Sequence, residues 1–141
     1  MALPNGAGGY QLGDGNLNET VLGYIATPPT LTGVTSVTLT ADQLEAGIIV
    51  ANPGTTATDY VLPIVVTAGG VEGVNDVISS AKVGSTFGLT IVNIGTTTGD
   101  VTVVAGTGWT LVGAVIVNNE TSAQFVARKT SDTTWTLYRT A

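Results

Sequence analysis

Short alternations of apolar and polar residues, interrupted every few positions by glycine, are the feature of this sequence that most restricts its fold. Alternation with period two is typical of strands that bury one face, whereas an amphipathic helix repeats its apolar residues every three to four positions. Thr and Val dominate these segments, and β-branched side chains suit a pleated sheet. The segments predicted to be strands are 36–40, 47–51, 58–67, 86–94, 100–105, 109–112, 114–117, 121–129 and 132–139.

The short spacing of the turns favours an all-β domain of antiparallel hairpins, arranged as a β-sandwich, a jelly-roll-like domain or a β-barrel. Glycines at 95, 99, 106, 108 and 113 are expected at the turns. Within each strand, one set of alternate residues should face the core. The residues predicted to do so are Phe87, Leu89, Ile91, Val101, Val103, Trp109, Leu111, Ala123, Phe125, Ala127, Trp135 and Leu137. Thr136 is expected on the opposite, exposed face.

Two short helical segments interrupt this pattern. Thr40 and Gln43 have the spacing of a capping box, in which a hydroxyl and an amide side chain satisfy each other's backbone N–H groups. Leu44 would then pack inward, and Gly47 would end the helix. The segment 71–81 carries apolar residues at helical spacing, although Gly73 weakens a helix there. One or two short helices are therefore predicted.

Residues 1–35 differ in composition from residues 36–141, which are predicted to form the β-sandwich domain. Glycines recur too often in 1–35 for a helix or a long strand, and Pro28 and Pro29 favour extended backbone. Apolar residues are nevertheless spread through this segment, and a plain linker would not need them. We therefore predict an extended N-terminal arm that becomes ordered by lying on another surface. The alternative is an arm that folds back on its own domain.

The small number of charged residues indicates a protein that works inside an assembly. Charged residues make up 10% of the chain and the net charge is -6, against about 25% charged residues in ordinary soluble domains. An uncharged polar surface loses little when it is desolvated against a partner. The acidic balance argues against a nucleic-acid partner and against an anionic membrane surface.

Two residue types that often carry catalysis are absent from the sequence, so that a nucleophile would have to be Ser, Thr, Lys or a carboxylate. It contains no histidine and no cysteine, so the commonest general base and the thiolate nucleophile are missing. No catalytic, cofactor-binding or metal-binding residue is predicted, and the chain is not expected to be an enzyme. Asp14 begins a segment like a calcium loop, but Glu19 and Ile25 stand where the loop needs Gly and Glu. The segment is interpreted as a tight turn.

Several stretches of the sequence resemble the head decoration, or capsid cement, proteins of tailed bacteriophages. Residues 8–19 read Gly-Gly-Tyr-Gln-Leu-Gly-Asp-Gly-Asn-Leu-Asn-Glu, which is similar to the N-terminal signature of that family. The stretches 39–50, 83–93, 105–113 and 125–139 are also similar, so that the resemblance covers most of the chain. The C-terminal stretches are less specific, because similar β modules occur in other phage structural proteins.

The resemblance implies a homotrimer on the outer capsid surface of the virion, where it would clamp neighbouring subunits of the phage major capsid protein. The arm residues expected to contact the capsid are Tyr10, Leu12, Asp14, Asn16, Leu17, Asn18, Glu19 and Tyr24. The alternative function is a tail-fibre or host-adhesion module that binds surface glycans. In that case Trp109, Trp135 and Tyr138 would face a sugar instead of packing in the core.

Overall fold

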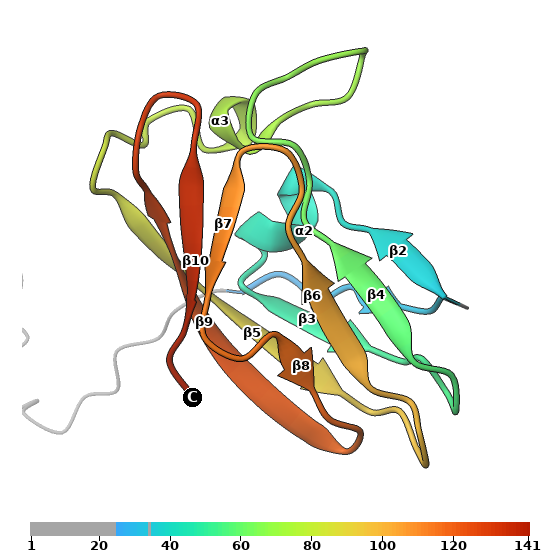
Figure 1. The fold of residues 1–141 in the computed structure, drawn as a ribbon. Coiled ribbons are helices and arrows are strands. Elements are labelled where there is room, and N and C mark those ends of the chain that lie inside the picture. The colour runs from blue at the N-terminus through green and yellow to red at the C-terminus, as the bar shows by residue number, and fades with distance from the viewer. Residues whose placement is uncertain (1–24, 34) are drawn as a thin grey trace, which may run out of the picture.

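The computed structural model describes residues 25–33 and 35–141, which form two β-sheets and two short helices (Figure 1). The all-β prediction is confirmed at this level. The six-stranded sheet has the order β1-β3-β5-β9-β10-β7, and the four-stranded sheet has the order β2-β4-β6-β8. The elements are β1 (Thr30–Leu31), β2 (Ser36–Thr38), α2 (Ala41–Glu45), β3 (Ile48–Ala51), β4 (Thr58–Val61), α3 (Val74–Val77), β5 (Thr86–Asn93), β6 (Val101–Val104), β7 (Trp109–Val112), β8 (Ile116–Val117), β9 (Thr121–Lys129) and β10 (Trp135–Arg139).

From β1 to β9 the chain changes sheet after every strand, and only β9 and β10 follow each other in the same sheet. Most neighbouring strands are therefore parallel: β1–β3, β3–β5, β2–β4, β4–β6 and β7–β10. Antiparallel pairing is confined to β5–β9, β9–β10 and β6–β8. The prediction of an antiparallel domain was wrong for most pairs. A short turn shows that the chain reverses direction, but here most reversals pass into the opposite sheet.

The turn between β5 and β6 explains why such a crossing needs glycine. A Cβ atom at Gly99 would lie 2.2 Å from the carbonyl oxygen of Gly54, and one at Gly95 would lie 2.5 Å from the carbonyl oxygen of Gly99. These separations are far below van der Waals contact, so any side chain would push the crossing apart. Both glycines were predicted to lie at turns, and both do.

The core lies between the inward faces of the two sheets. Of the residues predicted to face it, Phe87 and Leu111 are partly buried, and the others are buried. Leu44 is buried, as predicted for the first helix. Further core residues come from segments with weaker alternation; these are Leu39, Ile49, Tyr60, Leu62, Val65, Val74 and Val117. Thr136 was expected to be exposed but is buried, because it lies on a central strand between Arg128 of β9 and Thr110 of β7.

An aromatic cluster fills the core where β5, β7 and β10 meet. Trp135 is opposite Trp109 in the β7–β10 register, and their ring centroids are 6.1 Å apart. The ring of Phe87 lies 5.4 Å from that of Trp135. Each indole N–H has an acceptor: Trp109 donates to the Pro63 carbonyl at 2.8 Å, and Trp135 donates to the Asn75 side chain at 3.0 Å. The cluster therefore buries large apolar area without leaving an indole donor unsatisfied.

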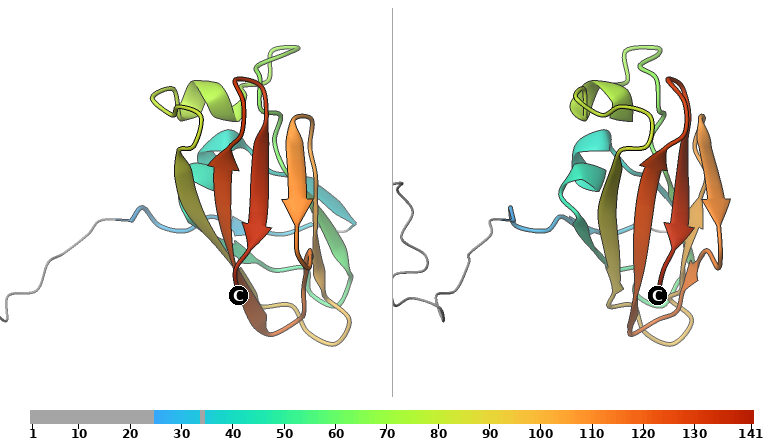
Figure 2. Two further views of the ribbon diagram at one scale, coloured as in Figure 1. Left: turned by 60° about the vertical axis from the view of Figure 1, so that its left-hand side comes forward. Right: turned by 90° about the vertical axis from the view of Figure 1, so that its left-hand side faces the viewer.

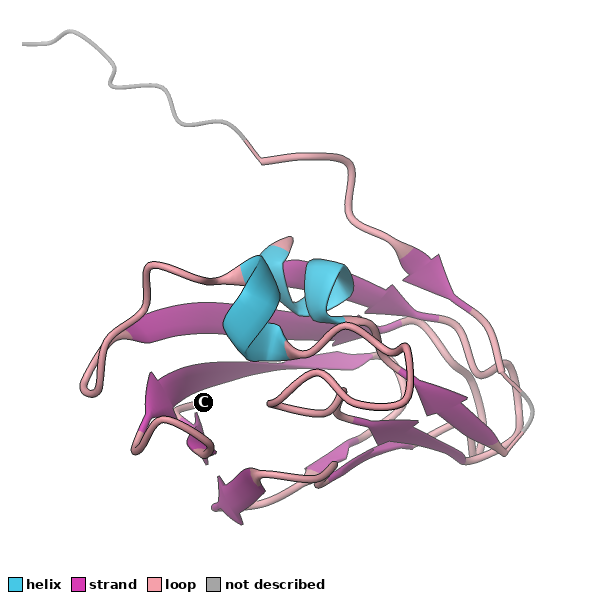
Figure 3. Cartoon of the chain, turned by 90° about the horizontal axis from the view of Figure 1, so that it is seen from above, coloured by secondary structure: helices cyan, strands magenta, loops and turns pink. Residues whose placement is uncertain are grey.

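The helices α2 and α3 lie next to each other at one end of the molecule (Figures 2 and 3). The capping box predicted for α2 is confirmed, since Thr40 and Gln43 exchange both side-chain-to-backbone hydrogen bonds. The predicted 71–81 helix is reduced to α3. Gly73 is the N-cap residue of α3 and, having no side chain, makes no capping hydrogen bond. No other residue fits at this position, because a Cβ atom there would lie 2.5 Å from the Val65 carbonyl oxygen.

Two predicted strands are shorter than expected. The segment 58–67 pairs as a strand only over β4, because Pro63 has no N–H to donate to a ladder. The segment 132–139 begins as a strand only at Trp135. Before it, Thr130 and Thr134 close a turn with backbone and side-chain hydrogen bonds.

The side-chain amide of Asn93 ties the two sheets together at the end of β5. Its Nδ2 atom donates to the carbonyl oxygens of Gly99 and Val117, both at 2.9 Å, and its Oδ1 atom accepts from the N–H of Gly95 at 2.8 Å. Asn93 lies in the six-stranded sheet and Val117 in the four-stranded sheet. All four residues are buried, so water cannot replace the amide.

Replacing Asn93 by Leu is expected to lower the free energy of unfolding by about 3 kcal/mol or more. The substitution leaves two carbonyl oxygens and one N–H buried without their partner, at roughly 1–3 kcal/mol for each group. Chemical denaturation followed by tryptophan fluorescence measures the change. Asn118→Leu, at an exposed position in the turn between β8 and β9, is the matched control and should change stability by about 0.5 kcal/mol or less. Equal losses for the two variants would contradict the role given to Asn93.

Candidate functional site

The eight arm residues predicted to contact a partner lie outside the residues that the structure describes. They are Tyr10, Leu12, Asp14, Asn16, Leu17, Asn18, Glu19 and Tyr24. Their role as a capsid-binding site therefore stays a prediction. The structure does describe where this segment joins the domain, from Ile25 onward, and it describes two recessed surfaces of the domain that are candidates for a binding site.

The chain joins the domain through β1, the edge strand of the six-stranded sheet. Val50 donates its backbone N–H to the carbonyl oxygen of Pro29 at 3.0 Å, and Asn52 donates to that of Leu31 at 2.8 Å. Residues 29–31 lie within the range predicted to be arm, and they pair with β3 in parallel. The N-terminal segment is thus attached to the edge of the sheet by strand pairing.

Tyr60 fixes this attachment from inside the core. Its hydroxyl donates to the Leu31 carbonyl oxygen at 2.9 Å, and its side chain is fully buried. The same carbonyl oxygen also accepts from Asn52, so both of its lone pairs are used. Burial raises the pKa of the Tyr60 phenol to about 12, because the charged form would lose its hydration. The hydroxyl therefore keeps its proton, and its hydrogen bond, over the whole physiological pH range.

The first surface is the outward face of the six-stranded sheet, next to the attachment point. A shallow groove of about 450 Å³ runs there, lined by Ile25, Ile48, Thr90 and Val126 among others. Gly88 has no side chain to fill the groove. The space beside it is open, since a Cβ atom placed there would have no heavy atom within 4 Å. The residues at outward-facing positions of β3, β5, β7, β9 and β10 are Ile48, Val50, Thr86, Gly88, Thr90, Val92, Thr110, Val112, Ser122, Gln124, Val126, Arg128, Thr136 and Tyr138. Arg128 is the single charged residue among them.

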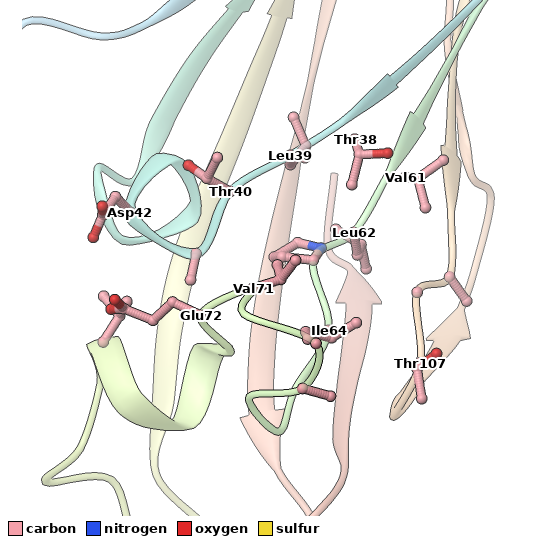
Figure 4. Close-up of a pocket in the computed structure, with 17 residues that line it drawn as sticks. Thr38, Leu39, Thr40, Asp42, Val61, Leu62, Ile64, Val71, Glu72 and Thr107 are labelled. Atoms are coloured by element: carbon pink, nitrogen blue, oxygen red, sulfur yellow. The ribbon is translucent and has the colours of Figure 1, made fainter.

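The second surface is an apolar pocket of about 820 Å³ between α2, β4 and the segment that leads to α3 (Figure 4). Its apolar lining includes Leu39, Leu62, Ile64 and Val71, with backbone from 105–107 on the far side. The charged residues among its described lining are Asp42 and Glu72, and both carboxylates lie on the side of the helices (Figure 4). We call this surface the acidic pocket. Its volume is within the range of about 300–1,000 Å³ that is usual for ligand sites.

A hairpin formed by residues 66–73 makes one wall of the acidic pocket and carries exposed apolar side chains. Val66 and Val71 are about half exposed, at 47% and 56%. The tip is closed by reciprocal backbone hydrogen bonds between Ala68 and Val71. At its base, the Thr67 hydroxyl accepts from the N–H of Gly73 at 2.8 Å and donates to the carboxylate of Asp76. These hydrogen bonds hold the hairpin in a fixed shape. Val66 and Val71 are therefore held in positions where they are exposed to solvent.

The aromatic residues considered for glycan stacking do not form a surface platform. Trp109 and Trp135 are buried in the aromatic cluster, and Tyr138 is half-buried on the outward face of β10. The prediction that the two tryptophans pack in the core is confirmed. Sequence reasoning missed the acidic pocket, since its lining residues lie between positions 38 and 107.

Comparisons with known proteins identify no relative: neither a family model, nor a curated protein, nor a solved structure matches this chain. Within the described residues, no helix is long and apolar enough to cross a membrane. The same part of the chain contains no group of three or more acidic residues placed to hold a metal ion. The function has to be argued from the residues and surfaces described above.

Replacing Tyr60 by Phe is expected to lower the free energy of unfolding by about 1 kcal/mol at pH 7, the usual net value of one hydrogen bond. It should also change the alkaline profile. In the unfolded chain the phenol ionises near pH 10, whereas in the folded chain it does so near 12. The stabilising contribution is therefore complete below pH 10 and is lost as the pH rises toward 12.

Urea denaturation at pH 7, 10 and 11.5 measures both effects. The loss of stability between pH 10 and 11.5 should be smaller in Tyr60→Phe than in the wild type. Tyr138→Phe is the control and should keep the wild-type profile. An unchanged alkaline profile in Tyr60→Phe would rule out a protonated, hydrogen-bonded Tyr60 in the folded protein.

Proposed function

We propose that this chain is a capsid decoration protein: a β-sandwich domain with an N-terminal arm that binds the outer surface of a phage capsid as a homotrimer. In this role it would clamp neighbouring subunits of the major capsid protein. The proposal starts from the resemblance of residues 8–19, and of most later segments, to capsid cement proteins. The β-sandwich is the architecture that two sheets around one shared core support best.

The observation that carries the proposal is the way the N-terminal segment joins the domain. A clamp has to transmit load from its arm to its body without local unfolding. Pairing of residues 29–31 with β3 and the hydrogen bond from Tyr60 to Leu31 supply such an attachment. Because β3 pairs in turn with β5, tension on the arm would pass from the edge strand β1 to the inner strands of the six-stranded sheet.

The surface chemistry of the domain suits binding within a crowded lattice. The outward face of the six-stranded sheet is built almost entirely from Thr, Ser, Gln, Val and Ile. Such a face costs little to desolvate, because it has few charges that must keep their water. Three arms on one trimer bind a lattice of identical sites, so weak contacts of each arm combine into strong overall binding.

The alternative, a tail-fibre or host-adhesion module that binds glycans, has less support from the described residues. Sugar rings are usually held on exposed aromatic faces, and the two tryptophans are in the core instead. Tyr138 alone on the outward face offers part of one aromatic ring. The attachment of the N-terminal segment would have no particular role in such a module. Capsid decoration is therefore the function that we favour.

Removing residues 1–24 is expected to abolish most binding to undecorated capsids and to leave the domain folded. The truncation ends before Ile25, so it keeps the pairing of residues 29–31 with β3. The melting temperature should stay within a few degrees of the wild-type value, since no described core residue is removed. Co-sedimentation with undecorated capsids, together with thermal unfolding, measures both quantities.

A second truncation, which removes residues 1–31, is the matched control. It deletes β1 and the acceptor of the Tyr60 hydroxyl, and it should lower the melting temperature as well as abolish binding. If the chain without residues 1–24 still decorated capsids like the wild type, the arm would not be the clamp. If it unfolded, the arm would belong to the core of the domain.

A further inference from the structure

A basic turn with an exposed apolar side chain lies between α3 and β5. Lys82 and Val83 are both exposed, Val83 by 57%. The whole chain contains four Lys and Arg residues, and three of them are gathered here. Lys129 donates from Nζ to the Ala81 carbonyl oxygen at 3.0 Å, and Arg128 has a guanidinium nitrogen 3.9 Å from where a Cβ on Gly84 would lie. We call residues 81–85, with Arg128 and Lys129, the basic turn.

The basic turn is held in a fixed shape by the end of β9. Gly84 donates its N–H to the Lys129 carbonyl oxygen, and Lys129 donates its N–H to that of Ser85, both at 2.9 Å. Ser85 closes the turn locally, since its hydroxyl accepts from the N–H of Lys82 at 2.9 Å. Val83 is therefore presented to solvent on a rigid support, so little conformational entropy would be lost if it were buried against a partner.

The acidic pocket has the complementary chemistry. It offers an apolar lining to an aliphatic side chain, and it carries Asp42 and Glu72 beside that lining with no cation among its described lining residues. The turn between α3 and β5 and the segments that line the acidic pocket, which include α2 and β4, lie on opposite sides of the end of the molecule that carries the helices (Figures 1 and 2). Because both are braced, the turn of one copy cannot reach the pocket of the same copy. It can reach that of a second copy.

We propose that the basic turn of one copy docks into the acidic pocket of the next copy, with Val83 on the apolar lining and Lys82 beside Asp42 and Glu72. Such a contact joins two different surfaces of the chain, so it is heterologous and closes into a ring when the rotation per copy allows it. The inference rests on the proposed function, in which three copies form the ring. Apolar burial supplies affinity, and the charges set the orientation of the two copies and the rate of their encounter.

Charge reversal on each side of the contact tests this inference. Lys82→Glu and Glu72→Lys should each weaken self-association at least tenfold, measured by sedimentation equilibrium over a range of concentrations. The double variant, with both reversals, should associate more tightly than either single variant, because the charges again attract. Val83→Asp should also give monomers. Glu120→Lys, an exposed reversal in the turn between β8 and β9, is the control and should associate like the wild type.

The outcomes separate this inference from the proposed function. Folding of each variant is checked by its melting temperature, which should match the wild type, since the changed side chains are exposed. Single variants that stay as trimeric as the wild type, or a double variant no tighter than the singles, would overturn the docking. So would a wild-type monomer that decorates capsids, which would leave capsid decoration standing but remove the homotrimer from the proposed function. A double variant that recovers trimers, together with a wild-type trimer that never binds capsids, would support the docking and overturn the proposed function.

Discussion

Almost every turn in this domain carries the backbone from one sheet to the other, and the structure depends on satisfying the polar groups of those crossings. A hairpin within one sheet continues the ladder of hydrogen bonds between strands. Where the chain crosses to the other sheet, the ladder ends at the edge of the core, and the backbone groups there need other partners. Buried N–H and C=O groups without partners are costly. The chain meets this requirement with the amide of Asn93 between β5, the 95–99 turn and β8, and with the Trp109 indole on Pro63. The glycines allow the backbones to approach closely at these places.

The sequence was sufficient to predict the inward-facing residues of the later strands, but not the earlier part of the core or how the strands pair. Alternation in segments such as 86–94 identified Leu89 and Ile91 as inward-facing, and the capping box of Thr40 and Gln43 identified α2. These signals are local, because a strand or a cap depends on residues within a few positions. Pairing is not local. Both sheets cover the same core, so the inward pattern of a strand is the same whichever sheet it joins. The parallel order of β2, β4 and β6 could therefore not be predicted from it.

The surfaces that we consider functional were difficult to predict for the same reason. The acidic pocket joins Leu39, Glu72 and Thr107, which no spacing rule connects. The basic turn shows a second difficulty. Lys129 occupies the next inward-facing position of β9 after Phe125 and Ala127, although lysine is rarely buried. Its burial is explained by the hydrogen bond from its Nζ atom to the Ala81 carbonyl oxygen. A lysine in that register indicates a strand end, where the side chain can turn away from the apolar core to an acceptor.

The edges of the two sheets are short. The strands at the edges are β1 with two residues, β7 with four, β2 with three and β8 with two. An exposed strand edge is a template on which another chain can add a strand, and long, flat edges lead to aggregation. In the proposed role of a capsid decoration protein, the chain would be made in many copies and would meet this hazard at high concentration. With edges this short, two copies that collide edge to edge can form few hydrogen bonds, so pairing between edges competes little with specific contacts.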